Sequence, residues 1–107
     1  MEAILYDTGV LIELNKKTLK GYTTALNVVE YPKILKIKGL KVIYPNARDY
    51  TLAMTISKDL YKIGKPVPAI DIVIAAVAIN RGLTLITKNR HFEYIKEVRR
   101  EFSFKII

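Results

Sequence analysis

The sequence predicts an α/β protein, built as a three-layer α/β/α sandwich around a mainly parallel sheet of about four strands. Short apolar runs, the pattern of buried strands, alternate with longer stretches whose apolar residues recur at helical spacing. This alternation favours parallel strands, because each crossover helix returns the chain to the same end of the sheet. The first apolar run ends in a carboxylate, at the edge where open α/β sheets bind ligands.

The composition is that of one globular domain, which we expect to span residues 1–107. The chain has no cysteine and one histidine, which excludes disulfides, thiol catalysis and sites with several histidine ligands. A bound metal would therefore need oxygen ligands, as Mg²⁺ and Mn²⁺ prefer. There is no signal-peptide pattern and no apolar run long enough to cross a bilayer, so we expect a cytoplasmic protein with no membrane partner.

The charge balance indicates a polyanionic partner. Eighteen lysines and arginines against ten aspartates and glutamates give a net charge of +8. In a small protein this excess favours nucleic acid as the partner. The alternative is that the surface lysines only aid solubility.

The first strand, residues 3–6, ends at Asp7, and a Thr8-Gly9 turn leads into a helix over residues 10–14. Asp7 lies where a ligand would bind, but aspartate also caps helices, so both interpretations stay open. Residues 15–21 are typical of a polar, basic loop that ends at a glycine.

A second helix is expected from Asn27, its N-cap, through a kink at Pro32 to about Lys38, with Gly39 closing it. Glu30 falls on the apolar stripe of this helix, where a carboxylate is costly unless a cation meets it. It is therefore a site candidate, with a capping box to Asn27 or a pair with Lys33 as the alternatives.

The second half of the chain continues the alternation. A strand over 40–44 precedes a helix over 47–63, with Asp49 on its solvated side, and a loop over 64–68. A nearly all-apolar helix follows over 69–81, with Asp71 in its first turn, where the helix dipole already favours a negative charge. A strand over 83–87, a short helix over 92–98 and an edge strand over 102–107 complete the fold.

Three acids stand in apolar surroundings, and we expect them to meet at one rim of the sheet: Asp7, Glu30 and Asp71. Converging carboxylates repel one another unless a divalent cation neutralises them. Together with the basic surface, this pattern indicates metal-assisted attack on a phosphodiester.

Four segments resemble the motifs of the PIN-domain family, in particular its VapC-like toxins, in the same order along the chain. They are residues 5–11, 24–30, 71–78 and 87–92. The resemblance implies a PIN-like fold, a ribonuclease dependent on Mg²⁺ or Mn²⁺, a homodimer, and an antitoxin protein that occupies the active-site groove.

By position, the resemblance makes Asp7, Glu30 and Asp71 catalytic, metal-binding carboxylates. Thr8 and Thr87 would support the site. Asn89 would join the catalytic set at the place where a fourth acid is common. Three features depart from the family: Gly9 replaces a polar side chain, Asn89 lacks the negative charge, and the stretch between the second and third acids is short.

Five basic residues flank the proposed rim and are candidates to hold an RNA backbone: Lys16, Lys17, Lys20, Lys88 and Arg90. A solvated basic loop is the alternative for them.

Three hypotheses of function remain. The chain is an endoribonuclease, as the toxin of a type II toxin–antitoxin pair. It is a weakened PIN-like module that binds RNA or a protein without cleavage. Or it is an unrelated α/β domain whose acids only cap helices.

Overall fold

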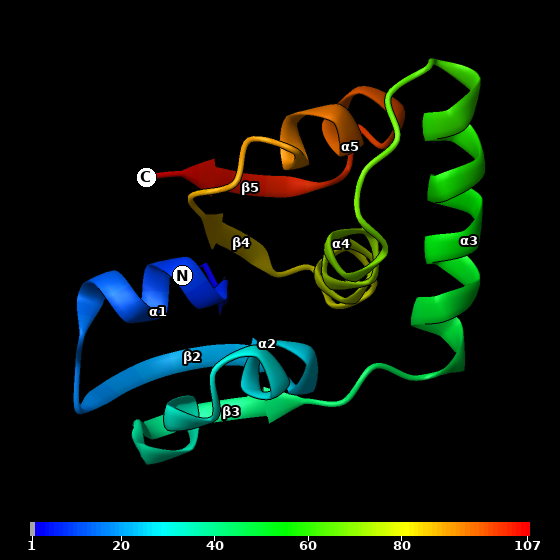
Figure 1. Ribbon diagram of the computed structural model, residues 1–107. Coiled ribbons are helices and arrows are strands. Elements are labelled where there is room, and N and C mark those ends of the chain that lie inside the picture. The colour runs from blue at the N-terminus through cyan, green and yellow to red at the C-terminus, as the bar shows by residue number, and fades with distance from the viewer. Residues whose placement is uncertain (1) are drawn as a thin grey trace.

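The computed structural model describes residues 2–107 and has a single parallel sheet over that range (Figure 1). The strand order is β3-β2-β1-β4-β5, and every neighbouring pair is parallel. The predicted α/β class is confirmed, with five strands in place of about four. The strands are β1 (Ile4–Tyr6), β2 (Thr18–Thr24), β3 (Lys38–Ile43), β4 (Thr84–Thr87) and β5 (Ser103–Ile106).

Helices connect the strands in two groups. The chain moves outward from β1 to β3, crosses back to β4 beside β1, and then moves outward again to β5. Right-handed crossovers therefore place the first group on one face of the sheet and the second on the other. The first group is α1 (Thr8–Leu14), α2 (Ala25–Glu30) and the 3₁₀ helix η1 (Pro32–Lys36). The second is α3 (Ala47–Lys62), α4 (Ala69–Arg81) and α5 (Phe92–Val98).

The main core lies between the sheet and the second group. Helix α4 is buried from Ile72 to Ala78, and Figure 1 shows it end-on between β4 and α3. Its alanines have small side chains, so the helix approaches the sheet closely. Leu5 and Leu85 from the central strands are fully buried in the same cluster. The predicted ranges of α3, α4 and α5 are confirmed, because each carries a strong local apolar pattern.

The expected loop over residues 15–21 is wrong, because β2 begins at Thr18. Gly21 lies inside this strand with φ of 145°, and a Cβ there would come within 2.8 Å of the Tyr6 ring. Gly39 lies inside β3 rather than at a helix end, with φ of 89°. In the sequence alone, both glycines looked like signals that end an element. In the structure they permit the close approach of neighbouring strands.

Helix α2 differs from the expected helix at both ends. Thr24 is its N-cap and forms a reciprocal capping box with Asn27. The helix ends at Glu30, and Pro32 begins η1, because proline lacks the N–H that a continuing helix needs. Glu30 is therefore exposed at a helix terminus and does not lie on a buried face.

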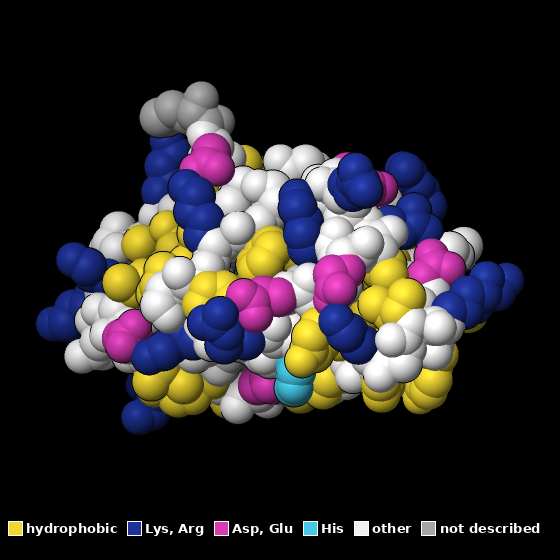
Figure 2. All heavy atoms as spheres, turned by 90° about the horizontal axis from the view of Figure 1, so that it is seen from above, with side chains coloured by type: hydrophobic (Ala, Val, Ile, Leu, Met, Phe, Trp, Pro, Cys, Tyr) yellow, Lys and Arg dark blue, Asp and Glu magenta, His cyan; other side chains and the backbone are white. Residues whose placement is uncertain are grey.

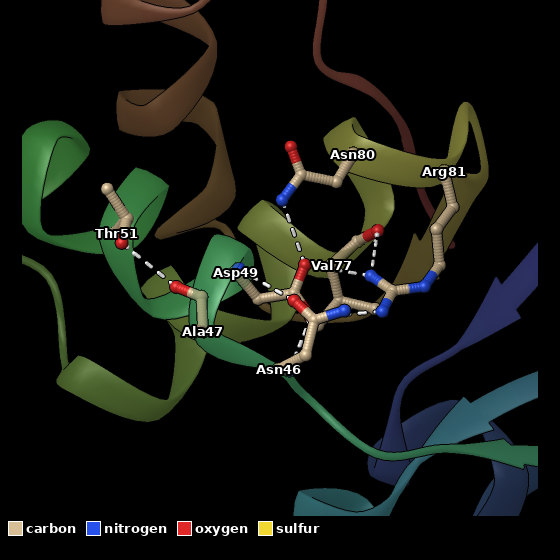
Figure 3. Close-up of polar contacts among 7 residues, drawn as sticks. All are labelled: Asn46, Ala47, Asp49, Thr51, Val77, Asn80 and Arg81. Carbon is tan, nitrogen blue, oxygen red and sulfur yellow. Dashed lines mark hydrogen bonds and ion pairs between the residues drawn. The ribbon is translucent and has the colours of Figure 1, made fainter.

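Asp49 is also placed differently from the sequence expectation of a solvated position. Its side chain is only 1% exposed, because Asp49 continues the buried stripe of α3 that contains Ala53 and Ile56. Figure 3 shows it between the start of α3 and the end of α4, where Arg81 donates two hydrogen bonds to it, at 2.8 and 3.0 Å. Asn80 and the Asn46 backbone donate two more.

These bonds satisfy the buried charge of Asp49. Burial would raise the pKa of the carboxyl group, but the hydrogen bonds from Arg81, Asn46 and Asn80 outweigh that effect and hold the pKa below its usual value. The cluster therefore stabilises the packing of the two longest helices, α3 and α4.

None of the helices within residues 2–107 is both long and apolar enough to traverse a membrane.

Candidate functional site

The candidate site lies at the carboxyl ends of β1 and β4, the two neighbouring strands from which the chain departs in opposite directions. This is the switch point at which open α/β sheets bind ligands. A cavity of about 360 Å³ opens there. It is lined by Asp7, Thr8, Gly9, Ile12, Glu30, Asp71, Lys88 and Asn89.

Asp7 is held by donors from three different elements. Its Oδ1 accepts hydrogen bonds from the Thr8 N–H and from Asn27 Nδ2, each at 2.9 Å. Its Oδ2 accepts one from Thr87 Oγ1 at 2.7 Å. The carboxylate is thus both the N-cap of α1 and a member of the cavity wall. Since each carboxylate oxygen accepts about two hydrogen bonds, Oδ2 keeps a free lone pair for a ligand.

Glu30 reaches the same cavity from the last residue of α2. Its Oε1 accepts a hydrogen bond from Thr8 Oγ1 at 2.9 Å, and that hydroxyl accepts one from Asn27 Nδ2. The Thr8 hydroxyl therefore joins Glu30 to the amide that also holds Asp7.

Asp71 enters from the first turn of α4, with a side chain 15% exposed. Burial is the largest cause that raises the pKa of its carboxyl group above the ordinary value. The negative charge of Asp7 raises this pKa further, and that of Glu30 raises it by a smaller amount. His91 nearby lowers it. The charges of Asp7 and Glu30 therefore disfavour the ionised form of Asp71, as expected of a carboxylate that shares a cation site with them.

Asn89 acts on its neighbours through both ends of its amide. Its Nδ2 donates to Asp71 Oδ2 at 3.0 Å, and its Oδ1 accepts from the His91 N–H at 2.9 Å. Its own N–H donates to Thr87 Oγ1, the buried hydroxyl that holds Asp7. Asn89 therefore orients Asp71 through its amide nitrogen, while the Asn89 amide oxygen accepts a hydrogen bond from the His91 backbone N–H.

Asn27 belongs to the site, although the sequence indicated only a helix cap. It is fully buried and donates to both Asp7 and Thr8. The signal available was its spacing of three residues after Thr24 and three before Glu30, which places one polar side chain in a capping box next to an acid.

The five basic candidates lie in four different places. Lys88 lines the cavity and forms an ion pair of 2.8 Å with Glu13, whereas Arg90 is exposed and pairs with Glu93. Lys16 and Lys17 line a neighbouring cavity on the same side of the fold.

The structure does not bring the remaining candidate, Lys20, to the site. It lies in the first half of β2 and lines a separate hollow with Glu2, Ile4 and Lys41. Figure 2 shows lysine and arginine side chains spread widely over one face of the molecule.

The oxygen atoms that line the cavity fit a hydrated divalent ion as metal ligands. Its charged acceptors are all carboxylate oxygens, which are the ligands of Mg²⁺ and Mn²⁺. Over residues 2–107, no three His, Cys, Asp or Glu side chains are grouped closely enough to hold an ion by themselves. Mg²⁺ usually keeps several waters and binds through one or two carboxylates, and the cavity has room for such waters.

The fold and the acid-lined switch point define a three-layer α/β protein with a candidate metal site. No protein-family model matches the sequence, and no curated protein matches it. Solved structures do match. A chain of the DNA-bound VapBC complex from Salmonella typhimurium has a TM-score of 0.77 at 20% identity, over 99% of this chain and 98% of that one.

Two further structures give the same result. A member of the VapBC family of toxin–antitoxin systems from Mycobacterium tuberculosis has a TM-score of 0.75 at 20% identity, over 100% of this chain and 98% of that one. FitAcB from Neisseria gonorrhoeae has a TM-score of 0.72 at 17% identity, over 94% and 95%. At these identities the likeness establishes the fold, so the PIN-like fold expected from the four sequence motifs is confirmed.

Proposed function

We propose that this chain is a divalent-metal-dependent endoribonuclease, a hydrolase that cleaves RNA phosphodiester bonds. One observation carries the proposal: Asp7, Glu30 and Asp71 come from three separate elements and line one cavity at the switch point of the sheet. A chain with a net charge of +8 has little reason to gather carboxylates, unless a cation and a phosphate are to meet there.

The proposed mechanism assigns a role to each side chain. Asp7, Glu30 and Asp71 would hold hydrated Mg²⁺ or Mn²⁺, one or two of them directly and the rest through waters on the ion. A bound ion would lower the pKa of a water and offset the charge that develops on the phosphate. Thr87 fixes the orientation of Asp7 through its 2.7 Å hydrogen bond, and Asn89 fixes that of Asp71.

Lys88 is the cation nearest to the proposed reaction among the basic candidates. It lines the cavity, and its partner Glu13 is half exposed, so that ion pair contributes at most about 1 kcal/mol. The Lys88 ammonium therefore exchanges Glu13 for a phosphate oxygen at little cost. This contact would hold the substrate backbone without reading its bases.

We further propose that residues 1–107 act as one domain, the toxin of a type II toxin–antitoxin pair, with a second copy and an antitoxin protein as partners. The support is the likeness over nearly whole chains to structures described as VapBC, one of them as a member of the VapBC family of toxin–antitoxin systems. Expression of the chain with and without a protein encoded beside it tests this role, because a toxin should arrest growth only when expressed alone.

A second candidate function is a PIN-like module that binds RNA or a protein without cleaving RNA. Two features favour it. The amide oxygen of Asn89 is engaged with the His91 N–H, and Gly9 adds no polar side chain to the cavity wall. Both reduce the number of oxygens available to a metal.

Cleavage of a mixed, structured RNA separates the two candidates. We expect the wild type to cleave with Mn²⁺ and not with chelator. Asp71→Asn should lower the rate by at least about 100-fold, because loss of a group that only supports a metal ligand already costs about 10–100-fold. Asp7→Asn should act likewise. Asp59→Asn is the matched control, because Asp59 lies on α3 and does not line the cavity.

Calorimetry with Mn²⁺ completes the test. The nuclease proposal expects a single binding event that Asp71→Asn removes and Asp59→Asn retains. A wild type that binds RNA but gives neither cleavage nor Mn²⁺ heat would refute the nuclease and support the binding module.

A further inference from the structure

Beside the acid-lined cavity lies a second one, of about 190 Å³, with the opposite charge. It forms where the end of α1 and the following loop meet η1. Its walls are Leu11, Ile12, Asn15, Lys16, Lys17, Tyr31, Lys33, Lys36 and Ile37. Four of these nine are lysines, and among these lining residues there is no carboxylate.

The four lysines form no ion pair within residues 2–107, unlike Lys65, Lys88 and Lys105. We name them the lysine pocket: Lys16, Lys17, Lys33 and Lys36. Uncompensated like charges gathered around one hollow repel each other, so an anion that enters it relieves the repulsion. The pocket is therefore a candidate anion site.

The frame beneath the lysine pocket is well fixed. Leu11 and Ile34 are buried, at 3% and 1% exposure. Asn15 adopts a left-handed conformation (φ 48°), and its N–H bonds to the Leu11 carbonyl, which ends α1 and turns the chain outward. The Lys38 N–H donates to the Lys17 carbonyl at 2.9 Å, which ties this loop to the start of β3.

The lysine pocket adjoins the acid-lined cavity. Ile12, half exposed on α1, lines both. Glu30 lines the acidic cavity, while Tyr31, the next residue, lines the basic one. A chain of phosphates that passes the carboxylates and crosses Ile12 would therefore reach the lysines directly.

We propose that the lysine pocket binds the RNA strand next to the bond that is cleaved, with its lysines on consecutive phosphates and with Tyr31 and Ile12 against the bases. The inference rests on the proposed ribonuclease function and names the subsite that would hold its substrate. A half-buried aromatic ring beside a basic groove is the usual combination for single-stranded nucleic acid.

Lys33, Lys36 and Tyr31 are the residues that this assignment adds to the earlier basic candidates. Lys33 and Lys36 lie in η1, an element whose sequence pattern looked like the end of a longer helix. The spacing of three residues in a 3₁₀ helix places them on one side, above the same hollow.

Binding of a short, fluorescein-labelled single-stranded RNA in EDTA, followed by anisotropy at several salt concentrations, tests the assignment. The variant is K33Q/K36Q, and the matched control is K58Q/K62Q on the exposed side of α3, with the same change of charge. Each cation on a single strand contributes about 0.7 to the salt slope, so we expect K33Q/K36Q to lower the slope by about 1.4. At about 0.15 M salt that loss corresponds to binding about tenfold weaker.

Three results would overturn the subsite: equal weakening by both double variants, no weakening by K33Q/K36Q, or no RNA binding by the wild type. A poly-glutamate peptide is the second probe. If K33Q/K36Q loses the peptide but keeps RNA, the lysine pocket serves an acidic protein segment and the proposal is wrong.

The Mn²⁺-dependent cleavage assay separates this proposal from the one on which it rests. RNA binding that depends on Lys33 and Lys36, without cleavage by the wild type, would leave the subsite and refute the nuclease. Cleavage by the wild type that is unchanged in K33Q/K36Q at subsaturating RNA would leave the nuclease and refute the subsite.

Discussion

Replacement of Arg81 by methionine tests the cluster that joins α3 to α4. In the native structure Arg81 donates two hydrogen bonds to Asp49, whose side chain is 1% exposed, while Arg81 itself is 27% exposed. Arg81→Met fills the space of the arginine stem but leaves the aspartate charge buried, with only Asn80 and the Asn46 backbone as donors. Loss of one partner of such a pair costs about 3–5 kcal/mol.

We take the lower end, about 3 kcal/mol, because the two remaining donors satisfy part of the charge. Urea unfolding followed by circular dichroism measures it. With an m-value of about 1.5 kcal/mol per molar, the midpoint should fall by about 2 M. In a thermal melt, at roughly 4 °C per kcal/mol, Tm should fall by about 12 °C.

Two further variants identify the cause. Arg48→Met changes an exposed arginine beside the same cluster and should cost less than about 0.5 kcal/mol. Adding Asp49→Asn to Arg81→Met removes the stranded charge, so the double variant should be more stable than Arg81→Met alone. If the double variant were less stable, or if Arg48→Met cost as much as Arg81→Met, the electrostatic explanation would be refuted.

Other variants test the acidic cavity and the charge of Asp49. Thr87→Val removes the hydroxyl that donates to Asp7 and accepts from Asn89, so Mn²⁺ affinity by calorimetry should fall by about 10–100-fold, whereas Thr87→Ser should retain it. Without metal, Asp71→Asn should raise Tm, because burial and the charge of Asp7 disfavour this carboxylate; a lower Tm would argue against that repulsion. The lowered pKa of Asp49 adds stability at neutral pH that is lost as the pH falls below about 4. In urea unfolding at a series of pH values, Asp49→Asn should therefore lose less stability than the wild type as the pH falls. An equal loss in both proteins would contradict this role of Asp49.

The sequence by itself determined the elements with strong local patterns. Helices α3, α4 and α5 follow from apolar residues at helical spacing and from the glycine that ends α4. Asp7 and Asp71 were identifiable as neighbours, because both stand at element ends that a parallel α/β fold brings to one edge of the sheet. Each of these inferences needs only residues that are close in sequence.

The tertiary structure alone decided the features whose partners are far apart in the chain. Strand β2 has no apolar run of its own and exists because β1 and β3 pair with it on both sides. Asp49 is buried as a charge because Arg81, thirty-two residues later, meets it. The lysine pocket likewise forms only where η1 packs beside the end of α1. Local patterns report what a segment prefers, whereas strand pairing and the compensation of buried charge depend on groups that the fold brings together.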